Sequence, residues 1–191
     1  QTTGTGNVAV GDRTLATVTT ADNNTAVGNQ SLRYNTTGSR GTAVGALALN
    51  ANTTGAKNTA IGYQALDANT TGGDNTAVGA FSLLSNTTGN NNVAMGQGAL
   101  ENNNASFNVA IGLGALQANT TGSYNTAVGT YAMDANTTAS ENSAFGYNAM
   151  GKNTTGNYNT GIGRESLSEN TTGINNTAVG NHALSNSTGD S

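Results

Sequence analysis

The chain has 191 residues, of which 35% are hydrophobic and 8% charged, whereas soluble globular domains have roughly 45–50% and about 25%. It contains no Cys, Pro or Trp, which excludes a disulfide-stapled domain and a Cys-based metal site. Six Lys and Arg with a net charge of −4 exclude a nucleic-acid-binding face, and the absence of a run of about 18 apolar residues predicts no membrane insertion.

One five-residue motif recurs along the chain: Asn24–Gly28 reads Asn-Thr-Ala-Val-Gly, and close copies are Asn58–Gly62, Asn75–Gly79 and Asn125–Gly129. Its closing glycine returns every 17 residues, with one step of 16 between Gly96 and Gly112. We call the residues at one position of successive repeats a column. The Gly column consists of Gly11, Gly28, Gly45, Gly62, Gly79, Gly96, Gly112, Gly129, Gly146, Gly163 and Gly180.

Four residues after each glycine stands Leu or Met, always preceded by a small residue. This Leu column consists of Leu15, Leu32, Leu49, Leu66, Leu83, Leu100, Leu116, Met133, Met150, Leu167 and Leu184. An Asn-Thr-Thr-Gly segment follows, for example at residues 35–38 and 69–72, and it is lost in the 16-residue repeat at residues 101–106. The whole unit is Asn-Thr-Ala-Val-Gly-x-x-Ala-Leu-x-x-Asn-Thr-Thr-Gly-x-x.

A 17-residue unit is too short for two helices and a turn, and Gly, Asn and Thr propagate helices badly. Two short segments per unit, each closed by Gly, predict two β-strands joined by turns. Stacked coils place Asn over Asn and Val over Val, so that amides bond along the axis. We therefore expect an all-β fold, a parallel β-solenoid of about eleven 17-residue coils and roughly 50 Å in length, as a single repeat domain over residues 1–191 that is a piece of a longer fibre.

The strand period of two places Thr25 and Val27 on one face and Ala26 on the other. The Val column is large and apolar, which predicts a buried row: Val10, Val27, Val44, Ile61, Val78, Met95, Ile111, Val128, Phe145, Ile162 and Val179. The Ala column is small, which predicts a close approach from another chain: Ala9, Ala26, Ala43, Ala60, Ala77, Ala94, Ala110, Ala127, Ala144, Gly161 and Ala178. Each coil has a thin core, so we expect an obligate homo-oligomer, with a trimer favoured over a monomer.

The motif resembles the head repeats of trimeric autotransporter adhesins of the Yersinia-adhesin type, most closely at Asn92–Gly96 and Asn108–Gly112. That resemblance implies a left-handed parallel β-roll with three chains side by side, although the unit here is longer than in that family. The longer unit is similar to repeats of phage and giant-virus tail-fibre proteins and of bacterial surface proteins. Both resemblances imply a fibrous, extracellular, cell-surface or virion-associated protein that adheres to a host or a surface.

A catalytic site needs an irregularity in the repeat, and the irregular residues are few. His182 is the only histidine, and Lys152 and Arg164-Glu165 are expected on a solvated face. No carboxylate pair recurs at catalytic spacing among Asp12, Asp67, Asp74, Asp134 and Glu141, and the Asp column of calcium-binding β-rolls is missing. We therefore predict a rigid, non-catalytic shaft without cofactor or metal.

Two binding alternatives remain. One is an adhesin head that binds a receptor or glycan directly through its tyrosines: Tyr34, Tyr63, Tyr124, Tyr131, Tyr147 and Tyr158. The other is an ice-binding solenoid, which the adjacent Thr36 and Thr37 disfavour because they lack the Thr-x-Thr spacing. Nine Asn also begin glycosylation sequons, and we expect their side chains to form an internal ladder instead: Asn35, Asn52, Asn69, Asn86, Asn119, Asn136, Asn153, Asn170 and Asn186.

Overall fold

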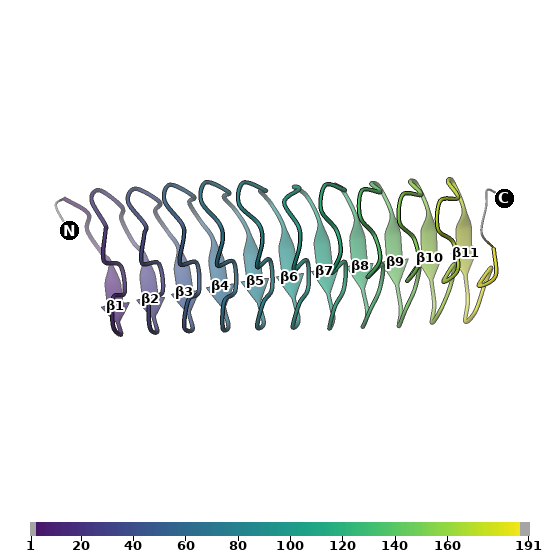
Figure 1. The fold of residues 1–191 in the computed structure, drawn as a ribbon, viewed down its shortest axis with the longest axis horizontal. Coiled ribbons are helices and arrows are strands. Elements are labelled where there is room, and N and C mark those ends of the chain that lie inside the picture. The colour runs from purple at the N-terminus through teal and green to yellow at the C-terminus, as the bar shows by residue number, and fades with distance from the viewer. Residues whose placement is uncertain (1–2, 188–191) are drawn as a thin grey trace.

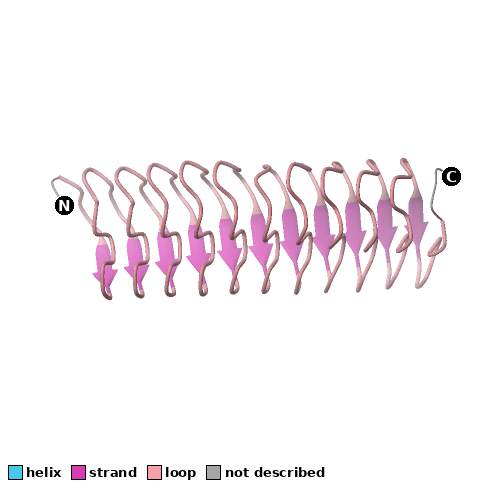
Figure 2. Ribbon diagram, viewed as in Figure 1, coloured by secondary structure: helices cyan, strands magenta, loops and turns pink. Residues whose placement is uncertain are grey.

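A computed structural model describes residues 3–187, which coil into a straight rod with one strand on every coil (Figure 1). The eleven strands form a single parallel sheet in sequence order, with about ten turns of a β-solenoid between them. The rest of the described chain is turn and loop without helix (Figure 2). The strands are β1 Val8–Val10, β2 Thr25–Val27, β3 Thr42–Val44, β4 Thr59–Ile61, β5 Thr76–Val78, β6 Val93–Met95, β7 Val109–Ile111, β8 Thr126–Val128, β9 Ser143–Phe145, β10 Thr160–Ile162 and β11 Thr177–Val179.

The register follows the repeat, so Thr25 lies opposite Thr42, Ala26 opposite Ala43 and Val27 opposite Val44. The stacking predicted from the sequence is therefore confirmed. The prediction of two strands per coil is wrong, because only the Thr-Ala-Val segment is a strand. The Asn-Thr-Thr-Gly segment turns sharply while its amides still bond to the next coil, as when Thr36 N donates to Thr53 O at 2.9 Å.

Backbone hydrogen bonds run around the whole circumference and in both axial directions. Thr25 N donates forward to Gly41 O at 2.9 Å, and Gly28 N donates backward to Val10 O at 2.8 Å. Away from the sheet, Leu32 N donates forward to Ala48 O at 3.0 Å. Each coil is thus tied to both neighbours at the corners as well as along the strand, which satisfies backbone groups that short strands alone would leave unpaired.

The interior is formed by the Ala column of the sheet and the Leu column of the opposite wall. Ala43, Ala60, Leu49 and Leu66 are all fully buried. The expectation that the Val column forms the buried core and that the Ala column meets another chain is wrong for this chain by itself. A 17-residue coil encloses a narrow space that Leu already fills, so only a methyl group fits opposite it, and Val27 and its equivalents point outward.

Two ladders of buried Asn side chains line the corners. In the first, Asn58 Nδ2 donates to Gly72 O at 2.7 Å, and its Oδ1 accepts from Asn75 N at 3.0 Å. In the second, Asn69 Nδ2 donates to Asn52 Oδ1 at 2.8 Å and to Gly72 O at 3.0 Å. These bonds confirm the predicted Asn ladder and explain how a core with so many polar side chains is tolerated.

The Leu column adopts a left-handed backbone conformation, with φ of 47° at Leu32, 55° at Leu66 and 50° at Leu83. Left-handed φ is costly for L-residues, so neighbouring coils must hold it in place. Two further columns share it, and none of the three contains Val, Ile or Thr, whose branched Cβ is least compatible with it. In the sequence, the absence of β-branched residues from these three columns is the signal of this conformation.

The Gly column is required both by its backbone and by its neighbours. Gly28 has a φ of 136°, and a Cβ added there would lie 2.5 Å from the carbonyl oxygen of Gly45 on the next coil. Any side chain would therefore force adjacent coils apart. The predicted role of Gly28, Gly45, Gly62, Gly79 and Gly129 as corner residues agrees with this geometry.

Candidate functional site

The outward face of the sheet carries the Val column as an apolar stripe along the full rod. Six of its members, Val44, Ile61, Met95, Ile111, Phe145 and Ile162, are between 37% and 42% exposed. The in-register pairing places them at successive steps of about 4.8 Å, so the stripe is about 48 Å long. A continuous apolar stripe of this kind marks an interaction surface.

The Thr side chains that lead the strands share this outward face with the Val column. They are replaced by Val8 in the first strand, by Val93 and Val109 in the middle of the rod and by Ser143 later. The strands that begin with Thr or Ser therefore present one hydroxyl beside one apolar side chain, the three that begin with Val present none, and Thr37 is exposed elsewhere on the coil. This is not the paired Thr-x-Thr array of ice-binding solenoids, and ice binding stays a prediction for which thermal hysteresis is the test.

A hollow of about 400 Å³ is lined by Tyr124, Glu141 and Ser143. Tyr124 is 60% exposed, and its ring stacks on Phe107 with centroids 5.1 Å apart and planes at 2°. The predicted tyrosines are thus not equivalent, because Tyr124 alone among them combines a stacked ring with a hollow.

The other tyrosines are exposed, and several of them have a neighbour of their own. Arg33 lies over the ring of Tyr34 at 4.6 Å, and Arg164 lies 5.8 Å from the ring centre of Tyr147. Tyr63 meets Phe81 edge to face, with centroids 5.5 Å apart. Tyr63 and Tyr147 share a column but lie five coils apart, and Tyr34 is in another column, so these contacts do not form one surface.

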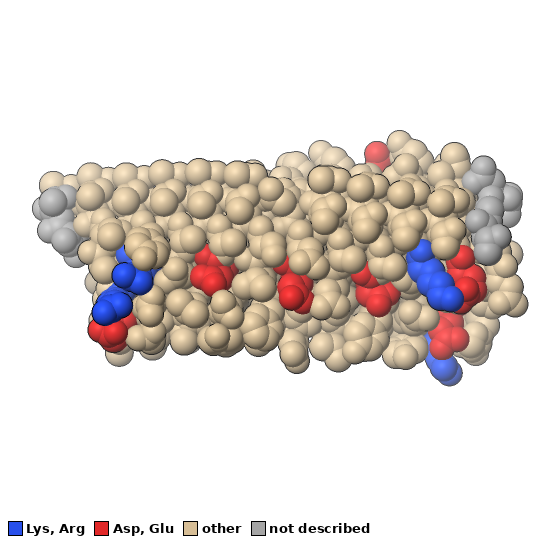
Figure 3. All heavy atoms as spheres, viewed as in Figure 1, with Lys and Arg blue, Asp and Glu red and all other residues tan. Residues whose placement is uncertain are grey.

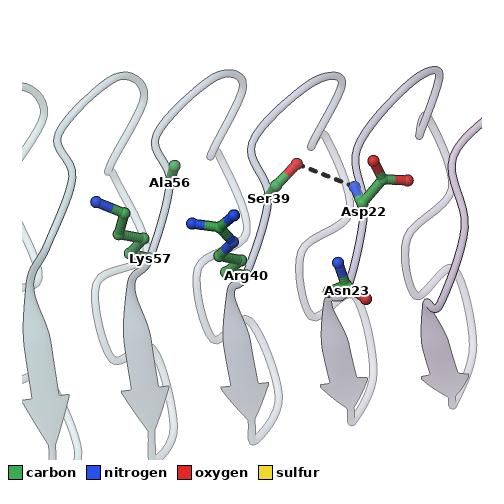
Figure 4. A pocket seen from close by; sticks show the side chains of 6 residues that line it. All are labelled: Asp22, Asn23, Ser39, Arg40, Ala56 and Lys57. Atoms are coloured by element: carbon green, nitrogen blue, oxygen red, sulfur yellow. Dashed lines mark hydrogen bonds between the residues drawn. The ribbon is translucent and has the colours of Figure 1, made fainter.

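A second hollow, of about 170 Å³, lies near the amino end between residues 22 and 57 (Figure 4). Arg40 and Lys57 project from successive coils at its rim, and Ser39 Oγ accepts from Asp22 N at 3.0 Å. Lys57 is 3.5 Å from Asp74, and Asp22 also lines the hollow, so its two cations are largely offset by nearby carboxylates.

Charged side chains are sparse on the face seen in Figure 3, where basic and acidic groups touch near both ends of the rod and single acidic groups lie between them. His182 Nδ1 lies 3.1 Å from Glu165 Oε2, Arg164 lies 2.9 Å from Glu165, and Lys152 lies 2.7 Å from Glu169. All these cations are exposed, in agreement with the solvated face expected for them. Exposed ion pairs contribute only about 0–1 kcal/mol each.

Asp134 stands apart among the scattered carboxylates. Burial raises the pKa of this carboxyl above its usual value, partly offset by backbone hydrogen bonds from Asp134 and Ala135. It occupies a lone position on its coil, and within residues 3–187 there is no group of three or more His, Asp or Glu side chains placed to hold a metal ion. The structure therefore brings none of the predicted carboxylates together.

Eight of the nine sequon asparagines lie in the second internal ladder, with their side chains 0–1% exposed: Asn35, Asn52, Asn69, Asn86, Asn119, Asn136, Asn153 and Asn170. Asn186 is the exposed exception. A glycan on any of the eight would require its coil to open, which agrees with the structural role predicted for them.

Comparison with protein families, curated proteins and solved structures found no match for this chain. No helix in the described residues is long and apolar enough to cross a membrane.

Proposed function

We propose that the chain is a structural shaft, a stiff spacer of a fibre that assembles laterally with copies of itself. The observation that supports this proposal is the apolar stripe of the Val column, which runs the length of the rod and remains partly exposed in a single chain. Covering such a stripe removes apolar surface from water, at about 25 cal/mol per Å².

A trimer is the arrangement we favour. The stripe is one side chain wide and repeats at every coil, so three parallel rods can turn it toward a common axis and cover it completely. The coils then stay in register across chains because they share one axial repeat. The left-handed coil and the extracellular, cell-surface or virion location implied by the family resemblance belong to this same proposal.

Stiffness follows from the bonding between coils. Each coil donates and accepts hydrogen bonds in both axial directions, and the Asn ladders add side-chain bonds at two corners. A rod of this kind resists bending because a bend would lengthen many of these bonds at once. Such a shaft would hold a distal element away from the surface that carries it, or present its own sides for adhesion.

Two adjacent substitutions test the proposal. Val78 is half-buried on the outward face, while Ala77 is fully buried in the core. We expect Val78→Asp to leave the β-structure intact in circular dichroism and to yield monomers in sedimentation velocity, with Ile111→Asp as a second variant on the same stripe. Ala77→Asp should instead unfold its coils.

The matched control is Thr37→Asp, because Thr37 is exposed away from the stripe. This variant should assemble like the unmodified chain. A well-folded monomer formed by the unmodified chain at the concentrations of the assay would contradict lateral assembly, and so would a Val78→Asp variant that sediments as the unmodified chain does.

A further inference from the structure

The column two residues before the start of each strand changes from polar to partly aromatic along the rod. We call it the corner column: Asn23, Arg40, Lys57, Asp74, Asn91, Phe107, Tyr124, Glu141, Tyr158 and Asn175. Before the 16-residue coil it is polar or charged, and from that coil onward it reads Phe, Tyr, Glu, Tyr and Asn. The two halves of the rod therefore present different chemistry on the same edge.

The aromatic part of the corner column is held in a fixed position. Phe107 N donates to Asn90 O at 3.0 Å, and Glu141 N donates to Ser123 O at 3.1 Å, which anchors the backbone of these residues to the preceding coil. The parallel stack of Phe107 and Tyr124 then fixes the Tyr124 ring, which remains 60% exposed. A rigid aromatic face binds a ligand without first losing side-chain freedom.

The groups beside this ring are acceptors and donors for hydroxyl groups. Glu141 and Ser143 line the same hollow of about 400 Å³, within the range of about 300–1,000 Å³ that ligand pockets occupy. In the described residues the Glu141 carboxylate has neither an ion pair nor a side-chain hydrogen bond, so its oxygens are available. A hydroxyl that donates to a carboxylate forms a charge-assisted hydrogen bond, about twice as strong as a neutral one.

A sugar ring matches this combination. Its C–H face is apolar and slightly positive, so it stacks on the negative face of an aromatic ring, while its hydroxyls at the rim donate to carboxylate and hydroxyl oxygens. A negatively charged sugar fits less well, because Glu141 and the net charge of −4 repel it.

We propose that the hollow beside Tyr124 binds a neutral oligosaccharide. One pyranose ring stacks on Tyr124, and its hydroxyls donate to Glu141 and accept from Ser143. Tyr158 lies two coils beyond Tyr124 in the same column, about 10 Å away, and is 55% exposed, so it can contact a more distant unit of a saccharide that runs along the rod. Ser143 stands on the outward face, two residues before Phe145 of the apolar stripe, so sugar binding requires that the lateral assembly of the rods leave the corner column uncovered.

The test is a titration of the unmodified full chain with three neutral probes, the tetrasaccharides of β-1,4-linked glucose, α-1,4-linked glucose and β-1,4-linked N-acetylglucosamine. Sialyl-lactose serves as the anionic comparison. Binding is followed by saturation-transfer NMR and by tyrosine fluorescence, which no Trp obscures in this chain. We expect at least one neutral probe to bind and sialyl-lactose to bind at least several-fold more weakly.

Three variants locate the binding site. Tyr124→Ala should weaken binding at least tenfold, whereas Tyr63→Ala, the control, removes a 49% exposed tyrosine from another column and should leave binding unchanged. Glu141→Gln keeps the shape of the hollow but removes the charge, and it should weaken binding several-fold. Circular dichroism of each variant establishes that it is folded.

Two results would overturn the proposal. One is the absence of binding for all three neutral probes. The other is binding by Tyr124→Ala that equals that of the unmodified chain; if that variant also changes the oligomeric state in sedimentation, the hollow is assigned to a second copy of the chain.

Discussion

The side-chain oxygen of Asn104 accepts from Thr87 the hydrogen bonds that a backbone carbonyl accepts elsewhere in the rod. Thr87 N and Thr87 Oγ1 each donate to Asn104 Oδ1 at 2.9 Å, and Thr88 N does so at 3.1 Å. One coil earlier, Thr70 N and Oγ1 donate in the same way to the carbonyl oxygen of Thr87. An amide side chain thus replaces the missing peptide group of the 16-residue coil.

This replacement predicts that Asn104 matters to stability despite its exposure. Asn104→Ala removes the acceptor of four hydrogen bonds from Thr87 and Thr88, the longest of them 3.5 Å, and should destabilise the protein by about 1–3 kcal/mol in thermal or denaturant unfolding. Asn104→Asp keeps the acceptor and should cost much less. Asn102→Ala, two residues away, is the control; if it destabilises the protein as much as Asn104→Ala, the proposed role of Asn104 is wrong.

The short coil also interrupts the second Asn ladder. Among the described residues, Asn86 Oδ1 is the buried side-chain oxygen that has no hydrogen-bond partner. Asn103, the next member, donates to Ala105 O within its own coil at 2.9 Å. Replacing residues 103–105 by Asn-Thr-Thr-Gly would restore 17 residues and let the new Asn reach back to Asn86. We expect a gain of about 1 kcal/mol, whereas the same one-residue insertion into Thr70-Thr71 should destabilise the rod.

The left-handed Leu column predicts an asymmetry between two conservative substitutions. Leu66→Met should be nearly neutral, because Met133 and Met150 already occupy the same column. Leu66→Ile has the same volume but a branched Cβ at a φ of 55°, and it should cost about 1–3 kcal/mol. The denaturant midpoints of the two variants measure this difference in stability. Equal midpoints would mean that the backbone at residue 66 leaves the left-handed conformation without cost.

The Asn ladder predicts intolerance to a single amide-to-acid change. Asn69→Asp removes the donors to Asn52 and Gly72 and places a carboxylate against their oxygens, for which we expect a loss of about 3–5 kcal/mol at pH 7. Asn91→Asp, at an exposed corner, should be nearly neutral in the same thermal-unfolding assay. If both variants unfold at the same temperature, the Asn ladder does not contribute the stability assigned to it.

The raised pKa of Asp134 predicts how the stability of the fold depends on pH. Because burial raises its pKa in the folded chain, its contribution to stability is fully present below the pKa of the unfolded chain and is lost as the pH rises through the raised pKa. Asp134→Asn mimics the protonated form. We expect the variant and the unmodified chain to melt alike near pH 3, and the variant to melt at a higher temperature at pH 7. A difference that is the same at both pH values would contradict this assignment.

The repeat made much of the fold predictable, because identical residues 17 apart can be satisfied together only by stacking. Thr25 over Thr42, the buried Leu66 and the Asn69 ladder all follow from that logic. The repeat did not predict which face of the strand is buried. The size of Val27 suggests burial, whereas the narrow coil has room only for Ala26. The sequence alone gave no measure of that room, since it depends on the left-handed turns at Leu32 and its equivalents.

The candidate site was predictable only in part. The sequence indicates the tyrosines as sugar contacts, but it distributes them over several columns of the repeat. Tyr124 and Glu141 are 17 residues apart and therefore become neighbours on one edge, and the irregular coil supplies Phe107 as the ring that supports Tyr124. The signal that could have found the site was the change in the corner column at the one-residue deletion.

Among the described residues, every strand contacts only the strands before and after it. Each coil presents the same carbonyls, amides and Asn side chains to the next, so any regular coil can follow any other. Recombination between the near-identical segments that encode them would add or remove whole units and leave both junctions intact. The length of the rod is therefore a heritable quantity that changes in steps of about 4.8 Å, independently of its chemistry.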